Sequence, residues 1–445
     1  MSKAFFPAWT KKYNGVIAPD ERLPIGQTAL MGLQHVIAMF GATVLGPMLM
    51  GFNPNLAILM SGVSTLLFFV LTRGRVPSYL GSSFAFIAPV GVATGYSVAS
   101  LMPNPNIGVA LGGIMCSGLL YALIGYLVKI VGTSWVERIM PPVVTGSIVA
   151  VIGLNLAGAA VHSAKSSNAD GWYMLMTIVC VAFVTVFAGG MLRRLLILSG
   201  LLLSSALYVL CVNVLRWGVG RSTGSKPVDF TGVHNAPWFG WPEFVTPVFN
   251  SSAILVLAPV AVILVAENLG HLRAVEAMTG RDMNPHMGSV FMGNGLANVI
   301  AGAVGSTGVT TYAENIGVMG VTKIYSTLAF LFAGLFAIVL GFSPKMGALI
   351  QLIPLPVMGG VSVVVFGLIA VTGVKIWIDH NVDFSQNSNL IVAGVTLIIG
   401  AGDFQLSIAG LELGGFGVAT LGAIALNALF AFKRADLTKP PTPVI

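Results

Sequence analysis

The chain has 445 residues, of which 8% are charged and 56% are hydrophobic, and its formal net charge is +7. Soluble domains contain about 25% charged residues. This composition excludes a soluble globular enzyme, a disordered chain and a disulfide scaffold, and it indicates a helical protein that crosses a membrane many times.

Apolar blocks of about 20 residues, the length of a helix that spans a bilayer, follow one another along the chain. Residues 1–26 precede the first block, contain no apolar run of signal-peptide type, and are expected to form a cytosolic tail, as are residues 434–445. Twelve long spans are predicted near residues 27–49, 55–72, 107–131, 142–162, 171–189, 194–214, 251–272, 285–304, 323–343, 348–371, 388–401 and 415–432.

Two shorter and more polar segments, near 83–97 and 308–320, raise the predicted number of spans to 14. With both counted, 17 Lys and Arg residues lie on the side of the N-terminus and 5 on the other. This bias predicts that both termini are cytoplasmic. The cations lie between apolar blocks, so the positive charge indicates membrane topology and no nucleic-acid partner.

The two short segments resemble each other. Ser82-Ser83-Phe84-Ala85 and Thr310-Thr311-Tyr312-Ala313 share the order small, small, aromatic, Ala at an offset of 228 residues. A second offset, of 214 residues, relates Gly146 and Gly153 to Gly360 and Gly367. Seven spans separate the halves, so the second half is inverted, an arrangement that indicates a secondary transporter.

The predicted fold is therefore an all-α polytopic membrane protein with 14 transmembrane segments in two inverted seven-span repeats. Spans 3 and 10 are broken, and each contains a short strand-like stretch. We expect Ser82-Ser83-Phe84 to pair with Thr310-Thr311 in antiparallel fashion, because extended backbone at membrane depth needs hydrogen-bond partners.

The clear cases of ionisable side chains inside predicted spans are His35, Glu267, His271 and Glu314. A charge at a helix centre costs roughly 2.5–3.5 kcal/mol on insertion scales, so such residues indicate function. Glu267 and His271 are four residues apart, on one helix face, where a carboxylate and an imidazole can share a proton. The alternative is a buried pair that holds two helices together.

Glu314 opens a half-helix whose first backbone N–H groups are free to meet a ligand. Together with Glu267 and the aromatic faces of Phe84 and Tyr312, it predicts a site for a flat, neutral ligand with N–H donors and C=O acceptors. His35 either orients this site or packs as an ordinary buried histidine. Cys116, Cys180 and Cys211 lie inside apolar blocks and predict no metal site.

These motifs resemble the nucleobase–ascorbate transporter (nucleobase:cation symporter 2) family, in particular its uracil permeases and Rut-pathway pyrimidine permeases. The similar segments are Gln34–Leu45, Tyr79–Phe86, Glu267–His271 and Thr310–Met319. Glu314-Asn315-x-Gly317 followed by Thr322-Lys323 fits the family signature E/Q-N-x-G-x4-T-K/R. The resemblance extends from about residue 15 to 434.

The resemblance implies a core domain of spans 1–4 and 8–11, residues 27–131 and 251–345. Spans 5–7 and 12–14, residues 132–250 and 346–433, would form a gate domain that can also mediate a homodimer. The substrate would bind between the two domains, and the protein would lie in the bacterial inner membrane.

The resemblance also assigns roles to residues. Glu267 and Glu314 would bind the base through hydrogen bonds, the backbones of Phe84 and Ala313 would contact its edge, and His271 would couple to Glu267 in proton handling. The supporting residues would be His35, which braces the tenth-span strand, with Tyr312, Asn315 and Phe366. Phe366 replaces an expected Tyr, and Ala313 replaces a usual Gly.

The resulting hypothesis is proton-coupled import of uracil by alternating access, without a cofactor or metal. Thymine and other pyrimidines stay open as substrates. The alternatives are a purine or xanthine symporter, an anion transporter of the same architecture, or a uniporter. An enzyme is not expected, because neither HExxH nor GxSxG occurs in a membrane-placed context.

Overall fold

The computed structural model describes residues 5–96, 103–162, 168–189, 196–217, 225–408 and 411–437. The outermost parts of the two predicted tails, residues 1–4 and 438–445, lie outside the described residues. The same holds for six of the cations counted for topology: Lys3, Lys165, Arg193, Arg194, Arg221 and Lys439.

The first half of the chain begins with two short strands and continues mainly as helices. These elements are β1 (Thr10–Lys11), β2 (Glu21–Arg22), α1 (Ile25–Met50), α2 (Pro54–Leu71), β3 (Leu80–Ser82), η1 (Phe84–Phe86), α3 (Ile87–Thr94), α4 (Ile107–Val131), α5 (Ser134–Ile139), α6 (Pro142–His162), α7 (Asn168–Phe187), α9 (Leu196–Val209), η2 (Leu210–Val214) and α10 (Thr231–Asn235).

The second half follows the same plan. Its elements are α11 (Ser251–Leu257), α12 (Val260–Thr279), η3 (Asn284–His286), α13 (Met287–Val304), β4 (Val309–Thr311), α14 (Ala313–Thr322), α15 (Thr327–Gly341), α16 (Pro344–Gln351), α17 (Leu355–Asp379), α18 (Asn387–Ala401), β5 (Leu406–Ile408), β6 (Leu411–Leu413) and α19 (Gly415–Leu437).

The protein is a multi-pass membrane protein. Within the described residues, eight helices are long and apolar enough to cross a bilayer, and a ninth span results if α15 and α16 are counted as one. Shorter apolar helices at residues 84–94, 142–158, 387–401 and 415–431 occupy four further predicted spans.

The span predicted at 348–371 is wrong at both ends. α16 ends at Gln351, bent by 81° from α15, and α17 begins only at Leu355 and continues to Asp379. Pro354 is the N-cap of α17 and Pro356 lies in its first turn, where a residue without an N–H costs no helical hydrogen bond. The break cannot be seen in the apolar run, because hydropathy measures polarity and carries no information about the effect of proline on the backbone.

Helix contacts obey the predicted repeat. α2 of the first half corresponds to α13 of the second, and α4 corresponds to α15. α2 packs on α15, and α13 packs on α4 in the equivalent arrangement. In the rest of the chain, α6 contacts α18 as α17 contacts α7, and α18 contacts α19 as α7 contacts α9. Equivalent helices in the two halves therefore have equivalent partners.

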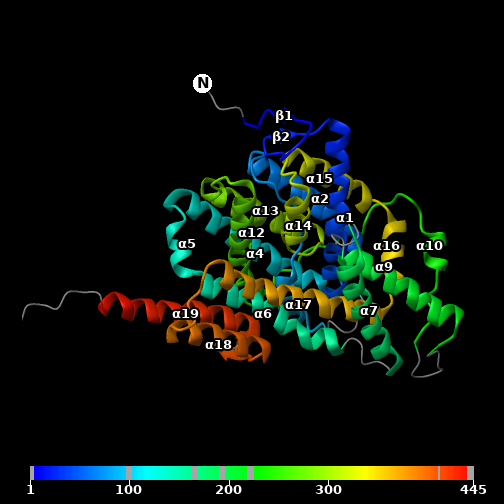
Figure 1. The fold of residues 1–445 in the computed structure, drawn as a ribbon. Coiled ribbons are helices and arrows are strands. Elements are labelled where there is room, and N and C mark those ends of the chain that lie inside the picture. Colours follow the sequence, from blue (N-terminus) through cyan, green and yellow to red (C-terminus); the bar gives the residue numbers. More distant parts are fainter. Residues whose placement is uncertain are drawn as a thin grey trace, which may run out of the picture.

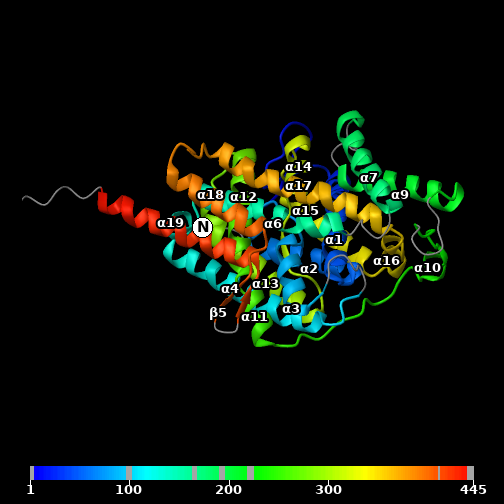
Figure 2. The same ribbon diagram turned by 90° about the horizontal axis from the view of Figure 1, so that it is seen from below.

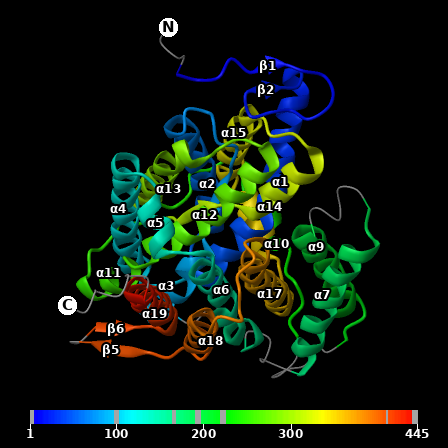
Figure 3. The ribbon, with the colours of Figure 1, turned by 60° about the vertical axis from the view of Figure 1, so that its left-hand side comes forward.

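Figures 1 and 3 show these helices in two groups. α1, α2, α4 and α12–α15 form one group, while α6, α7 and α17–α19 lie together along one side of it. From below, Figure 2 shows the chain between α10 and α11 running as an extended segment past the first group, near α3 and β5.

Glycines allow the paired helices to approach closely. A Cβ on Gly118 of α4 would lie 2.7 Å from the Gly295 carbonyl oxygen of α13, and one on Gly62 of α2 would lie 2.5 Å from the Gly334 carbonyl oxygen of α15. Small residues at such crossings let helices pack without a hydrophobic driving force between them.

The N-terminal segment folds back on the first helix group. Ile17 is buried and exchanges backbone hydrogen bonds with the α14–α15 connection, donating to Lys323 (3.0 Å) and accepting from Tyr325 (2.8 Å). Glu21 closes the segment on itself: hydrogen bonding to the Ala18 N–H and then to the Lys12 ammonium lowers the pKa of its carboxyl.

Two glycines of α17 give a matched test of close packing. A Cβ on Gly373 would lie 2.4 Å from the Ala150 backbone nitrogen of α6, whereas one on Gly367 would have no heavy atom within 4 Å. We expect Gly373→Ala to destabilise the protein by about 1–3 kcal/mol through overpacking. Gly367→Ala is expected to be neutral or stabilising by up to about 1 kcal/mol. Melting temperatures in detergent measure both, and equal effects would contradict the packing of α6 on α17.

Candidate functional site

A two-stranded antiparallel sheet joins the two halves of the chain. β3 pairs with β4 in the register Leu80–Thr311, Gly81–Thr310 and Ser82–Val309. This confirms the predicted pairing of the broken spans, although the ladder lies two residues earlier in the first half than expected. Ser83 still donates to the Gly308 carbonyl (2.8 Å), and the helical turn η1 starts at Phe84.

Each strand leads into a helix that begins beside its partner strand. Ser83 caps η1 by accepting from the Ala85 N–H (3.3 Å). The N-cap residue of α14, Tyr312, provides no side-chain cap, and in this first turn the Glu314 N–H donates to the carboxylate of Glu314 itself. Ala313 and Glu314 occupy this first turn.

These elements line a cavity of about 360 Å³. From the first helix group it is lined by Ser82, Phe84, Ala85, Glu267, Gly270, His271, Ala274, Thr310–Glu314, Ile316 and Gly317. From α6 and α17 it is lined by Val149, Ile152, Ile369, Thr372, Lys375, Ile376 and Asp379. The volume is in the range of small-molecule sites.

The structure thus brings together six of the residues singled out from the sequence, namely Phe84, Glu267, His271, Tyr312, Ala313 and Glu314. The two carboxylates come from different helices, α12 and α14, and Phe84 comes from the other repeat. The cavity therefore offers hydrogen-bond acceptors, backbone donors and one aromatic face together.

Glu267 and His271 share a face of α12 but bond to different residues. The Thr310 hydroxyl bonds to the Glu267 carboxylate, and His271 Nδ1 bonds to the Thr311 hydroxyl. None of the hydrogen bonds among the described residues joins the two side chains directly, so the expected contact is replaced by a link through consecutive threonines of β4. The Glu267 Oε2 atom is buried and has no hydrogen-bond partner within the part of the chain that the structure describes.

A cluster of asparagines lies behind the threonines. Asn268 accepts from the Thr311 hydroxyl (2.9 Å) and from Asn294 Nδ2 (3.1 Å), and it donates to the Thr310 hydroxyl (3.2 Å). The sequence did not single out these residues. Buried amides at i and i+4 along α13 were the available signal, because apolar spans rarely carry them without a partner.

His35 lies outside the cavity and contacts the half-helix, where contact with the strand was expected. Asn315 Nδ2 lies 3.1 Å from His35 Nδ1 and donates to the His35 carbonyl (3.0 Å). The histidine ring also packs on Phe330, with ring centroids 4.3 Å apart. His35 and Asn315 together attach the first turn of α14 to α1.

The predicted aromatic residues take different positions. The ring of Phe84 meets Phe366 edge to face, with centroids 6.1 Å apart, and Phe366 is buried behind the cavity. Tyr312 is also buried: its hydroxyl donates to the Ser82 carbonyl (2.9 Å), and its ring covers Gly81. Tyr312 is therefore a brace of the sheet, and its ring is no open face for a ligand.

The α17 side of the cavity was missed in the sequence. Lys375 was counted among loop cations, because the span was expected to end at 371. Lys375 and Asp379 lie one turn apart in α17, are exposed, and belong to the lining of the cavity. The spacing of Ile369, Thr372, Ile376 and Asp379 along one helix face was the signal that could have identified this wall.

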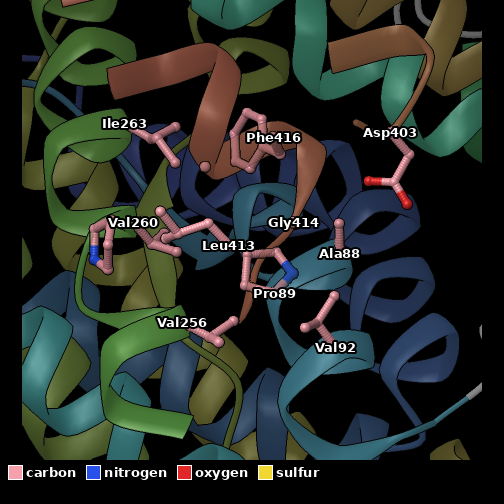
Figure 4. Close-up of a pocket in the computed structure, with 12 residues that line it drawn as sticks. Ala88, Pro89, Val92, Val256, Val260, Ile263, Asp403, Leu413, Gly414 and Phe416 are labelled. Carbon is pink, nitrogen blue, oxygen red and sulfur yellow. The ribbon is translucent and has the colours of Figure 1, made fainter. Parts of the chain in front are cut away.

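A second, much smaller cleft of about 30 Å³ lies near the opposite end of α12 (Figure 4). Val260 and Ile263 meet Leu413 and Phe416 there, and the volume is about a twelfth of that of the first cavity. Asp403 lies at its edge, where it accepts from the Gly415 N–H (3.0 Å). This cleft is too small and too apolar to be the ligand site.

Comparisons with known proteins agree on one family. The sequence profile of the permease family (Xan_ur_permease) matches residues 26–409. The chain is 58% identical to the putative pyrimidine permease RutG of Escherichia coli K12 over 444 residues, 99% of this chain and 98% of that protein. It is 41% identical to the uracil permease of Paenibacillus larvae, over 93% of this chain and 96% of that protein. It is 40% identical to the uracil permease of E. coli K12, over 96% of both chains.

Solved structures share the fold at low sequence identity. The transmembrane domain of the cyanobacterial bicarbonate transporter BicA superposes with a TM-score of 0.60 at 16% identity, over 94% of this chain and 99% of that domain. SLC26A9 superposes with a TM-score of 0.64 at 13% identity, over 92% of this chain and 66% of that protein. At such identities the likeness concerns the fold alone.

Two alanines of α12 test the cavity without a ligand. Ala274 lines the cavity, whereas Ala266 is fully buried on another part of the same helix. In a variant without Cys116, Cys180 and Cys211, we expect a small water-soluble thiol reagent to modify Ala274→Cys rapidly and Ala266→Cys at least tenfold more slowly. Mass spectrometry of the purified protein gives both rates, and equal rates would contradict an open cavity at this face.

Proposed function

The chain belongs to the permease family of nucleobase–ascorbate transporters, which are transporters and not enzymes. On this premise we propose that it imports uracil in symport with protons by alternating access. The cavity between the two helix groups carries the proposal. Relatives described as uracil or pyrimidine permeases cover nearly the whole chain and support this substrate class.

The chemistry of the cavity fits a pyrimidine base. Glu267 and Glu314 can accept hydrogen bonds from ring N–H groups, and the Ala313 N–H at the start of α14 can donate to a ring carbonyl. Phe84 can stack on the face of the base. Two carboxylates in one small cavity repel an anion, which argues against sulfate or bicarbonate as the substrate.

The topology of the proposal has 14 spans and cytoplasmic termini, in a bacterial inner membrane. Residues 27–131 and 251–345 form the core domain, residues 132–250 and 346–433 form the gate domain, and the substrate lies between them. The lipid-facing gate domain provides the contact for a homodimer.

The positions of the cavity that Glu267 and Glu314 line and of the small apolar cleft support alternating access. The large cavity extends toward Ala274 and Asp379 at the C-terminal ends of α12 and α17, the end at which Arg281 pairs with Asp20 of the N-terminal segment (2.5 Å). With a cytoplasmic N-terminus, the cavity faces the cytoplasm. At the other end of α12, the apolar side chains around the small cleft then close the outer side. This arrangement corresponds to an inward-facing stage.

Glu267 is the proposed coupling residue, acting with His271. A proton on this unit neutralises it and favours binding of the neutral base, and loss of that proton inside favours release. Moving one charge through 100 mV supplies about 2.3 kcal/mol, enough to concentrate a neutral solute about fiftyfold.

Uptake of labelled uracil into proteoliposomes tests substrate and coupling together. With an inward proton gradient we expect accumulation of up to about tenfold per pH unit for one proton per uracil. A protonophore should abolish it, and unlabelled uracil but neither xanthine nor sulfate should compete. Competition by xanthine would make the protein a purine symporter, competition by sulfate an anion transporter, and simple equilibration a uniporter.

The role of Glu267 is tested by Glu267→Gln, with Glu276→Gln as the matched control. Glu276 lies on the same helix, pairs with Arg273 (2.7 Å) and does not line the cavity. We expect Glu267→Gln to abolish gradient-driven accumulation and to weaken uracil binding about 10- to 100-fold, because a charged acceptor is lost. Glu276→Gln should behave like the wild type. Gradient-driven accumulation by Glu267→Gln would remove the proton role.

A further inference from the structure

The outer edges of the β3–β4 sheet are closed by side chains. Hydrogen-bonded pairs alternate along an antiparallel ladder. Because Tyr312 donates to the Tyr79 carbonyl and Ser83 to the Gly308 carbonyl, the bonded pairs include Gly81–Thr310. The N–H and C=O groups of Leu80 and Val309 therefore point away from the sheet.

Asn298 of α13 takes the place of a third strand beside Val309. Its Oδ1 accepts from the Val309 N–H at 2.7 Å, and its Nδ2 donates to the Val309 carbonyl at 2.9 Å. The second proton of the amide bonds to the Asn294 carbonyl at 2.8 Å. Asn298 is fully buried, so water does not compete for these bonds.

Thr65 of α2 does the same for Leu80. Its hydroxyl oxygen accepts from the Leu80 N–H at 3.0 Å, and the hydroxyl donates to the Leu80 carbonyl at 3.4 Å. Thr65 is also fully buried. Leu80 and Val309 are the first residues of their strands, and α2 and α13 are equivalent helices of the two repeats, so the same device occurs twice.

We propose that Asn298 and Thr65 are positioning residues for the substrate. By forming hydrogen bonds with the N–H and C=O groups of Val309 and Leu80, they fix the positions of the two strands relative to α13 and α2. β4 is followed by Tyr312 and then directly by Ala313 and Glu314, and β3 is followed by Ser83 and Phe84. A shift of either strand therefore moves the backbone and side chains that face the cavity. The inference rests on the proposed function, since it takes uracil as the ligand of that cavity.

The test is a saturation binding curve with labelled uracil on the purified full-length protein. Asn298→Leu removes the amide at similar volume, and we expect the Kd for uracil to rise at least tenfold. Thr65→Val removes only the hydroxyl and should raise the Kd at least fivefold, while Thr65→Ser should stay within twofold of the wild type. Thr396→Val makes the same chemical change in α18, where the hydroxyl only bonds to Val392 of its own helix, and it should have no effect.

The Kd distinguishes positioning from mere stabilisation. A residue that only stabilises the fold would reduce the amount of folded protein and leave the Kd of the folded fraction unchanged. A Kd within twofold of the wild type for both Asn298→Leu and Thr65→Val would overturn the proposal. If Asn298→Leu does not fold, the comparison of Thr65→Val with Thr65→Ser still tests the proposal, and an unchanged Kd in Thr65→Val would overturn it.

Hydrogen–deuterium exchange of peptides covering residues 306–314 separates this inference from the proposed function. Faster exchange in Asn298→Leu than in Thr396→Val is expected whether or not uracil is the substrate, and equal exchange would contradict the edge-closing role. Absence of uracil binding by the wild type would instead contradict the proposed function.

Discussion

Six strand residues lie among helices that cross a membrane, and their backbone polar groups must all find partners without water. The backbone groups of Gly81 and Thr310, a third of the total, pair across the sheet, and Thr65, Asn298 and the Tyr312 hydroxyl bond to others at its edges. Because the two strands belong to different halves of the chain, this pairing forces the halves together. It also places the starts of η1 and α14 at opposite ends of the sheet, and residues from both starts line the cavity.

Much of the fold was accessible from the sequence, because block length and the offset between similar segments reflect bilayer thickness and repeat symmetry. The span predicted at 107–131 coincides with α4, and the strand pairing was expected within two residues. Hydropathy could not find the break at Pro354, so it misplaced α17 and with it Lys375. Short-range patterns likewise could not show that Glu267 and His271 each meet a different threonine, because that depends on how β4 crosses α12.

The solved structures of similar fold include a bicarbonate transporter, so the architecture alone does not define what is carried. The difference has to come from the side chains around the cavity. In this chain the cavity is lined by Glu267 and Glu314 near the sheet, and by Lys375 and Asp379 from the C-terminal part of α17. The proposed binding of a neutral base rests on these side chains and not on the fold.

The shared sheet also has a consequence for biosynthesis. Leu80 and its partner Thr311 are 231 residues apart in the chain. At 5–20 residues per second, the first strand leaves the ribosome roughly 10 to 45 s before the second exists. During this time Thr65, which is already made, can hold the outer edge of β3, but the inner edge at Gly81 has no strand to pair with. During membrane insertion of the first half, the unpaired edge of β3 must therefore be kept from the lipid until β4 has been synthesised.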